Sequence, residues 1–152
     1  MMIDADNILE GNIFLKIFFL TAYYASWTKQ EIEILKELGH TVYFYHSTEY
    51  GKTRPIPRVA IIGGLYRALK TFLKSLPFCR KSEIIYCWFV FPTGVYAVLL
   101  GKLLRKPVLL NAVGCDVAYI RSIDYGAPLK PYFRPFIKWA LKNAAKVVAI
   151  SE

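Results

Sequence analysis

Short apolar runs alternate with amphipathic segments along this chain, and the pattern predicts an α/β fold. Runs rich in Ile, Val, Leu and aromatic residues are expected to be strands buried on both faces. The five predicted strands are residues 13–22, 41–45, 84–90, 108–112 and 146–150. Because each connection is long enough to hold a helix, the strands should lie parallel in one sheet.

Between these strands, apolar residues recur with the period of a helix. The predicted helices are residues 28–38, 59–76, 95–104 and 132–145. Thr28 and Glu31 have the spacing of a capping box, with Ser26 as a rival cap, and Gly39 should end the first helix. Residues 95–104 are apolar on almost every side, so we expect that helix to be buried.

The second predicted helix combines an apolar stripe with a cationic face. The stripe, expected to pack on the sheet, is Ile62, Leu65, Leu69, Phe72, Leu73 and Leu76, and the opposite face is Arg67, Lys70, Thr71 and Lys74. Residues 77–82, which begin with a proline, should be a linker, because proline disrupts the interior of a helix.

Right-handed crossovers between these elements predict a three-layer, Rossmann-like domain with strand order 3-2-1-4-5. The length of 152 residues indicates one domain. Residues 1–12 form a polar, loose leader, and residues 13–152 form the domain. Ser151 is suited to cap a further helix, so we expect the domain to continue beyond this chain, or to be completed by a partner.

Composition narrows the class of protein. A hydrophobic content of 55% excludes disorder, and no run of 18 uncharged apolar residues is present. The leader is acidic, which is the wrong sign for a signal peptide. Cys79, Cys87 and Cys115 lack the spacing of metal ligands and fit a reducing cytoplasm, so we expect no metal site.

Positive charge is concentrated in one block. Residues 52–82 carry eight Lys or Arg and no acid within a net charge of +9. Such a block indicates an anionic partner, which could be a membrane, a nucleic acid or a phosphate-bearing substrate. We assign membrane or anion contact to Arg67, Lys70 and Lys74, which places the protein in the cytoplasm, peripheral to the inner face of the membrane.

Polar and aromatic residues follow the first, third and fourth predicted strands, in the turns 23–27, 88–93 and 113–117. Ligands of parallel α/β sheets bind at the carboxyl ends of the strands. The candidate substrate-binding residues are Tyr23, Tyr24, Ser26, Trp27, Trp88, Thr93, Gly114 and Asp116. With the first and fourth strands adjacent, Gly114 should lie within reach of Ser26 or Trp27.

Each candidate has a plainer structural interpretation. The aromatic side chains are suited to stack on a sugar ring or an isoprenoid chain, or to pack in the core. Thr93 could cap a helix, and Asp116 could accept a sugar hydroxyl or hold its own turn. Neither a dinucleotide-binding G-x-G-x-x-G nor a P-loop is present.

Three segments in order resemble the N-terminal half of a family 4 glycosyltransferase of the GT-B type. SWTKQEIEILKELGHTVYFY (26–45) resembles that family's first helix and second strand. WFVFPTGVYAVLLGKLLRKPVLLNAVGCDV (88–117) resembles its P-x-G helix and H-G-x-D turn, and AAKVVAISE (144–152) resembles its A-D-x-V-I-A-V-S-E strand.

The resemblance implies transfer of a sugar from a nucleotide-sugar to a polysaccharide or lipid-linked acceptor. In that family the N-terminal domain holds the acceptor, and a C-terminal domain holds the donor with two carboxylates. This chain has no donor domain, so no cofactor is expected in it and it should be inactive alone. Val113 replaces the histidine of H-G-x-D, and valine cannot form side-chain hydrogen bonds.

Two other functions stay open. One is a non-catalytic subunit that docks a split transferase on a membrane. The other is a basic α/β module that binds nucleic acid, which is less favoured because the sequence has neither a helix-turn-helix nor aromatics on strand faces. A donor domain or partner subunit is required by the first function and by the enzyme alike.

Overall fold

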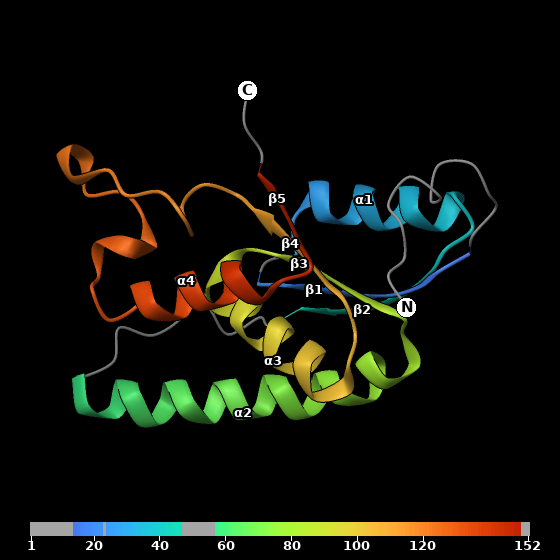
Figure 1. Ribbon diagram of the computed structural model, residues 1–152, viewed down its shortest axis with the longest axis horizontal. Helices are drawn as coiled ribbons and strands as arrows, with labels where there is room; N and C mark the ends of the chain where they lie inside the picture. Colours follow the sequence, from blue (N-terminus) through green and yellow to red (C-terminus); the bar gives the residue numbers. More distant parts are fainter. Residues whose placement is uncertain (1–13, 23, 47–56, 150–152) are drawn as a thin grey trace.

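The computed structural model describes residues 14–22, 24–46 and 57–149, which form one α/β domain (Figure 1). Its strands are β1 Lys16–Thr21, β2 Thr41–His46, β3 Ile84–Trp88, β4 Val108–Ala112 and β5 Lys146–Ala149. Its helices of more than one turn are α1 Ser26–Glu37, α2 Pro57–Lys81, α3 Val95–Leu104 and α4 Arg134–Asn143. The predicted leader, residues 1–12, lies outside the described residues.

All five strands are parallel, as the sequence predicted, but their order is β2-β1-β3-β4-β5. The predicted order 3-2-1-4-5 is therefore wrong, because it put β3 at an edge beside β2. The burial of the two strands explains the difference. Ile85 and Cys87 of β3 are fully buried, whereas no residue of β2 is, and edge positions suit half-exposed strands.

The helices divide between the two faces of the sheet. Helix α1 lies on one face, and α2, α3 and α4 cover the other (Figure 1). This division follows from right-handed crossovers, because the chain moves one way from β1 to β2 and the opposite way in the later connections. The main core lies under α2–α4 and is contributed by alternate strand residues such as Phe18, Leu20, Ile85 and Leu110.

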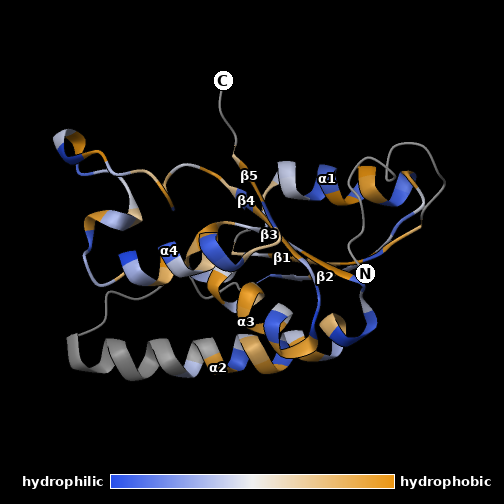
Figure 2. Ribbon diagram, in the orientation of Figure 1, coloured by the Kyte–Doolittle hydropathy of each residue, from blue (hydrophilic) through white to orange (hydrophobic). Residues whose placement is uncertain are grey.

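Helix α3 is buried along one side only. Val98 and Leu100 are fully buried, in line with the predicted burial of this helix, whereas Leu99 and Leu103 on its outer side are 44% and 61% exposed. Gly101 allows the close approach of α3 to the sheet, because a Cβ there would lie 2.3 Å from a methyl carbon of Val108. Figure 2 shows hydrophobic residues continuing from the sheet into α3.

Helix α2 differs from its prediction in its end and in its inner face. It continues through Pro77 to Lys81, and the predicted linker 77–82 is wrong. Pro77 is exposed, so the carbonyl that loses its hydrogen bond can be hydrated. The inner line is instead Thr71, Ser75 and Cys79, whose small side chains permit close packing.

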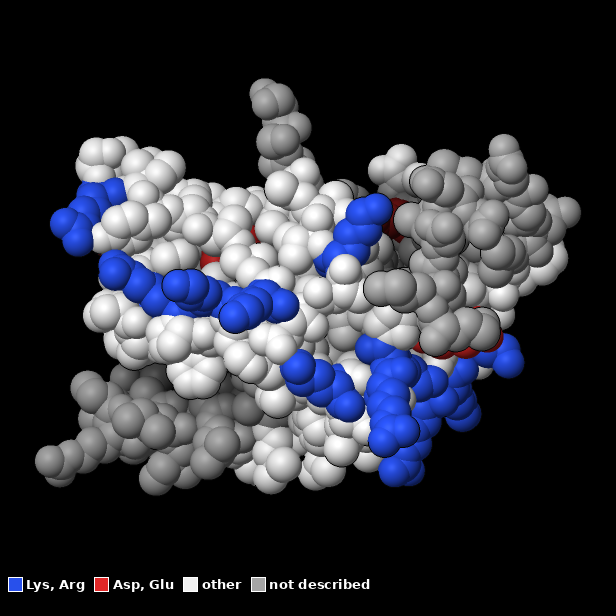
Figure 3. All heavy atoms as spheres, viewed as in Figure 1, with Lys and Arg blue, Asp and Glu red and all other residues white. Residues whose placement is uncertain are grey.

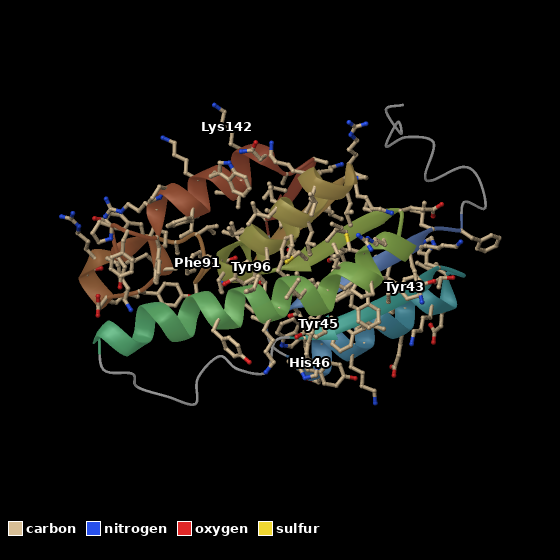
Figure 4. All side chains as sticks on the ribbon, turned by 90° about the horizontal axis from the view of Figure 1, so that it is seen from below. Tyr43, Tyr45, His46, Phe91, Tyr96 and Lys142 are labelled. Atoms are coloured by element: carbon tan, nitrogen blue, oxygen red, sulfur yellow. The ribbon has the colours of Figure 1, made fainter. Side chains whose placement is uncertain are left out.

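As a consequence, Leu69 and Leu73 of α2 are turned outward, with 55% and 56% of their surface exposed. Phe72 and Leu76 do pack against the core, as predicted. On the sheet side of α2, Tyr43 and Tyr45 of β2 also pack against the core and lie beside the helix (Figure 4). The predicted outward position of Thr71 is wrong, since this residue is 4% exposed.

Helix α1 begins two residues earlier than the capping-box spacing predicted. Ala25 occupies the cap position without a side-chain hydrogen bond, and Thr28 is fully buried inside the helix. The capping box and the rival Ser26 cap are therefore both wrong. Gly39 ends the helix as predicted, with a φ of 87°, in the left-handed region that glycine tolerates best.

Candidate functional site at the carboxyl edge of the sheet

The turns that follow β1, β3 and β4 lie at one edge of the sheet, because parallel strands place their carboxyl ends together. β3 pairs with β1 on one side and with β4 on the other. The predicted adjacency of the first and fourth strands is thus wrong. Residues 88–93 lie between turns 23–27 and 113–117, so the predicted direct approach of Gly114 to Ser26 or Trp27 has no basis in strand pairing.

Aromatic rings cover the part of this edge that follows β1 and β3. The ring of Trp27, at the start of α1, lies 4.3 Å from that of Trp88 at the end of β3, at an interplanar angle of 33°. Tyr24 packs beside His46 at the end of β2. Tyr24 is 53% exposed and Trp27 is 39% exposed, so both offer ring surface to a ligand.

Glu31 holds the Trp88 member of this pair by a hydrogen bond, a role that the sequence interpretation missed. Its Oε1 accepts a hydrogen bond from the hydroxyl of Tyr86, and its Oε2 accepts one from Nε1 of Trp88. Helical spacing could have indicated the contact, because Glu31 lies one turn after Trp27 and therefore on the same face of α1. The carboxylate fixes the orientation of the Trp88 indole.

The network behind the edge continues to Asn111 of β4. Its Nδ2 donates to the Tyr86 hydroxyl oxygen at 3.4 Å, while its buried Oδ1 has no hydrogen-bond partner among the described residues. Burial, then the hydrogen bond and charge of Glu31, raise the pKa of Tyr86. Tyr86 is therefore a neutral donor at physiological pH. The sequence offered a signal for this network, because Asn111 is a polar residue inside an otherwise apolar strand.

Asp116 joins the turn after β4 to the turn after β3. It is 2% exposed, its Oδ2 accepts from the Val90 N–H, and its Oδ1 accepts from the Val113 N–H at 3.1 Å. Both oxygens of the carboxylate are thus engaged with backbone. Of the two roles considered for Asp116, this geometry supports the structural one, and contact with a sugar hydroxyl stays a prediction.

Thr93 is also a structural element of the edge. It is fully buried, and its hydroxyl lies 2.9 Å from the Trp88 carbonyl oxygen and 3.2 Å from that of Phe89. The helix-cap interpretation is wrong, because α3 has no side-chain cap hydrogen bond. Thr93 instead supports Phe89, whose φ of 73° is unusual for a residue with a side chain.

The remaining candidates divide by exposure. Ser26 is exposed, and Trp88 and Gly114 are half-buried, so these three join Tyr24 and Trp27 as positions that a ligand can reach. Tyr23 lies outside the described residues, as does the side chain of Arg67. The other two residues assigned to anion contact differ, since Lys74 is exposed and Lys70 is half-buried.

The cysteine side chains are not activated as nucleophiles. Burial raises the pKa of Cys79 to about 11 and also raises the pKa values of Cys87 and Cys115, so these thiols are protonated at neutral pH. Among the described residues, no three His, Cys, Asp or Glu side chains group as metal ligands do.

Comparison of the chain with protein-family models and with curated proteins finds no match. Over the ranges that the structure describes, none of the helices has both the length and the apolar character needed to cross a membrane.

Proposed function

We propose that this chain is the acceptor-side domain of a nucleotide-sugar-dependent glycosyltransferase that acts on a polysaccharide or lipid-linked acceptor. The observation that carries the proposal is the aromatic surface at the carboxyl edge, where Trp27 lies against Trp88 and Tyr24 is exposed beside them. Aromatic rings of this kind bind the apolar faces of sugars. The three motif resemblances in the sequence support the same assignment.

The nucleotide-sugar donor is assigned to a second domain or a partner subunit. The described residues offer no pair of exposed carboxylates at the carboxyl edge, because Asp116 is buried and Glu31 is engaged with Tyr86 and Trp88. This chain would position the acceptor and exclude water, while the other domain supplies the donor. Expressed alone, it should bind acceptors without transferring sugar.

The test is binding of the labelled chain to an array of oligosaccharides and glycolipids. The wild-type chain should retain a defined subset of glycans, and Trp27→Leu should weaken that binding about two- to tenfold, since aromatic stacking contributes roughly 0.5–1.5 kcal/mol. Trp139→Phe on α4 is the matched control and should bind like the wild type. Retention of no glycan, or equal loss in both variants, would reject the proposal.

A second candidate function is a membrane-docking subunit of a split transferase. It is favoured by the outward faces of α2 and α3, where Leu69, Leu73, Leu99 and Leu103 are all more than 40% exposed. Exposed Lys74 and Lys102 lie on the same two helices. Apolar side chains bordered by cations are what an interfacial surface needs to rest on an anionic bilayer.

Co-sedimentation with anionic and neutral vesicles across a salt series tests this docking function. Anionic vesicles should bind the chain, and salt should weaken the binding because exposed charges are screened within about 8 Å at physiological ionic strength. Replacing Arg67, Lys70 and Lys74 by Gln should remove the anionic preference. The control replaces Lys16, Lys29 and Lys36, outside the α2–α4 helical layer. Equal sedimentation with both vesicle types would argue against docking.

A further inference from the structure

Two arginines share one tyrosine ring in the segment that follows the Gly114 turn. The guanidinium carbon of Arg134 lies 4.7 Å from the centre of the Tyr119 ring, and that of Arg121 lies 5.3 Å from it. Arg121 also donates from Nε to the Tyr119 hydroxyl, and Arg134 donates from Nε to the carbonyl oxygen of Pro128 at 2.7 Å. Both side chains are thus oriented, and their terminal nitrogens stay available as donors.

The described residues supply no ion-pair partner for the positive charge of this pair. No carboxylate lies within ion-pair distance of Arg121 or Arg134 in the part of the chain that the structure describes. Loss of hydration would raise the pKa of Tyr119, but the hydrogen bond and charge of Arg121, with those of Arg134, lower it. Both guanidinium groups lie within 5.3 Å of the centre of one ring, and their like charges repel each other, so an anion bound beside them would relieve the repulsion.

Backbone hydrogen bonds hold the loop that carries Arg121 in place. Ile120 and Tyr125 exchange two backbone hydrogen bonds, both of 3.0 Å, which close a short hairpin around Arg121. The amide of Ala127 donates to the carbonyl oxygen of Cys115 at 2.7 Å. The bond from Ala127 ties the hairpin to the turn after β4, so Arg121 lies on a fixed loop at the carboxyl side of the sheet, and Arg134 is held at the start of α4.

Arg134 is also the first residue of a row of cationic side chains on α4. Arg134, Lys138 and Lys142 are exposed and four residues apart on α4, which places them on one face of the helix. Figure 3 shows blue side chains in a row over α4, and others near the loop. Like charges at this spacing destabilise a helix slightly, so the row is expected to face an anionic partner.

We infer that Arg121 and Arg134, oriented by Tyr119, form a binding site for a phosphate or diphosphate group, with Lys138 beside it on α4. Arginine is suited to this ligand because its planar guanidinium donates two parallel hydrogen bonds to phosphate oxygens. The phosphate could belong to a soluble molecule or to a lipid headgroup. The site lies apart from the Trp27–Trp88 surface, so its occupation does not depend on the proposed sugar-binding function.

The test measures binding of inorganic pyrophosphate by calorimetry and of phosphatidylglycerol-containing vesicles by co-sedimentation. The variant is Arg121→Gln with Arg134→Gln. The control, Arg80→Gln with Arg105→Gln, removes two exposed arginines at the opposite edge of the sheet. Loss of charge-assisted hydrogen bonds should weaken binding at the site at least about tenfold in the variant and leave the control unchanged.

The two probes identify the source of the phosphate. Saturable pyrophosphate binding that only the variant loses supports a site for a soluble phosphate. Vesicle binding that only the variant loses, and that pyrophosphate does not compete, supports a site for a lipid phosphate. Absence of both kinds of binding, or binding that the variant retains or that both double variants lose equally, overturns the inference.

Ultraviolet titration of Tyr119, taken as the difference from Tyr119→Phe, gives a second readout. A bound phosphate places negative charge beside the phenolate, so pyrophosphate should raise the pKa of Tyr119 in the wild type. It should leave Tyr119 unchanged in the variant. Where calorimetry shows that pyrophosphate binds, a Tyr119 titration curve that it does not move in the wild type would place that binding elsewhere and overturn the assignment.

Discussion

Replacing Asp116 by Asn should unfold the carboxyl edge before it affects any ligand contact. The carboxylate accepts from two backbone N–H groups, those of Val90 and Val113, and it is 2% exposed. Asn presents one oxygen and one NH₂ group in the same space, so one N–H group loses its acceptor and faces a donor. A hydrogen bond to a charged group contributes about 1.5–3 kcal/mol, and an unsatisfied buried N–H costs about 1–3 kcal/mol.

We therefore expect Asp116→Asn to lower the free energy of unfolding by about 2–4 kcal/mol, a large share of the total for a domain of this size. Urea unfolding followed by far-ultraviolet circular dichroism measures it. Asp124→Asn is the control, because it removes the same charge at an exposed residue. The φ of 49° at Asp124 is one that Asn tolerates. A loss for Asp116→Asn below about 0.5 kcal/mol would refute the structural role.

Two other substitutions test how the edge and its network are built. Gly126→Ala should lower thermal stability more than Gly114→Ala: both have positive φ, of 116° and 102°, but a Cβ on Gly126 would lie 1.8 Å from the Ala118 carbonyl oxygen. Equal losses would contradict that packing. Because the folded-state pKa of Tyr86 is raised, its stabilisation is present below about pH 10 and lost as pH rises further. Tyr86→Phe should flatten the alkaline fall in unfolding free energy, and parallel wild-type and variant curves would oppose this.

The elements of this fold could be predicted from sequence because their patterns are local. Apolar runs marked all five strands, and Gly39 marked the end of α1 at the residue where it occurs. Strand order is not local, because it depends on which strand is buried on both faces. The prediction put β1 directly beside β4, whereas β3 lies between them. Local periodicity also could not decide which face of α2 packs on the sheet. The large apolar side chains marked one face, but the line of small residues Thr71, Ser75 and Cys79 is the buried one.

The position of the candidate site could be predicted from the sequence, but not which of its residues face a ligand and which hold the turns. Parallel topology alone put turns 23–27, 88–93 and 113–117 at one edge. Which side chains face a ligand depended on partners distant in sequence, since Asp116 is used by Val90 and Glu31 by Tyr86. The arginine pair was not predicted for the same reason, because Arg121 and Arg134 are distant in sequence and meet only at the Tyr119 ring.

The most direct test of the proposed acceptor surface uses the three tryptophans of the chain as position-specific probes. Each indole N–H gives its own signal in a ¹⁵N-labelled sample, and Trp27 and Trp88 lie at the carboxyl edge while Trp139 lies on α4. Titration with an oligosaccharide retained on the glycan array should shift the signals of Trp27 and Trp88 together and leave Trp139 unmoved. A saturable shift confined to Trp139, or no shift at Trp27 and Trp88 at saturating ligand, would contradict the assignment of this edge to acceptor binding.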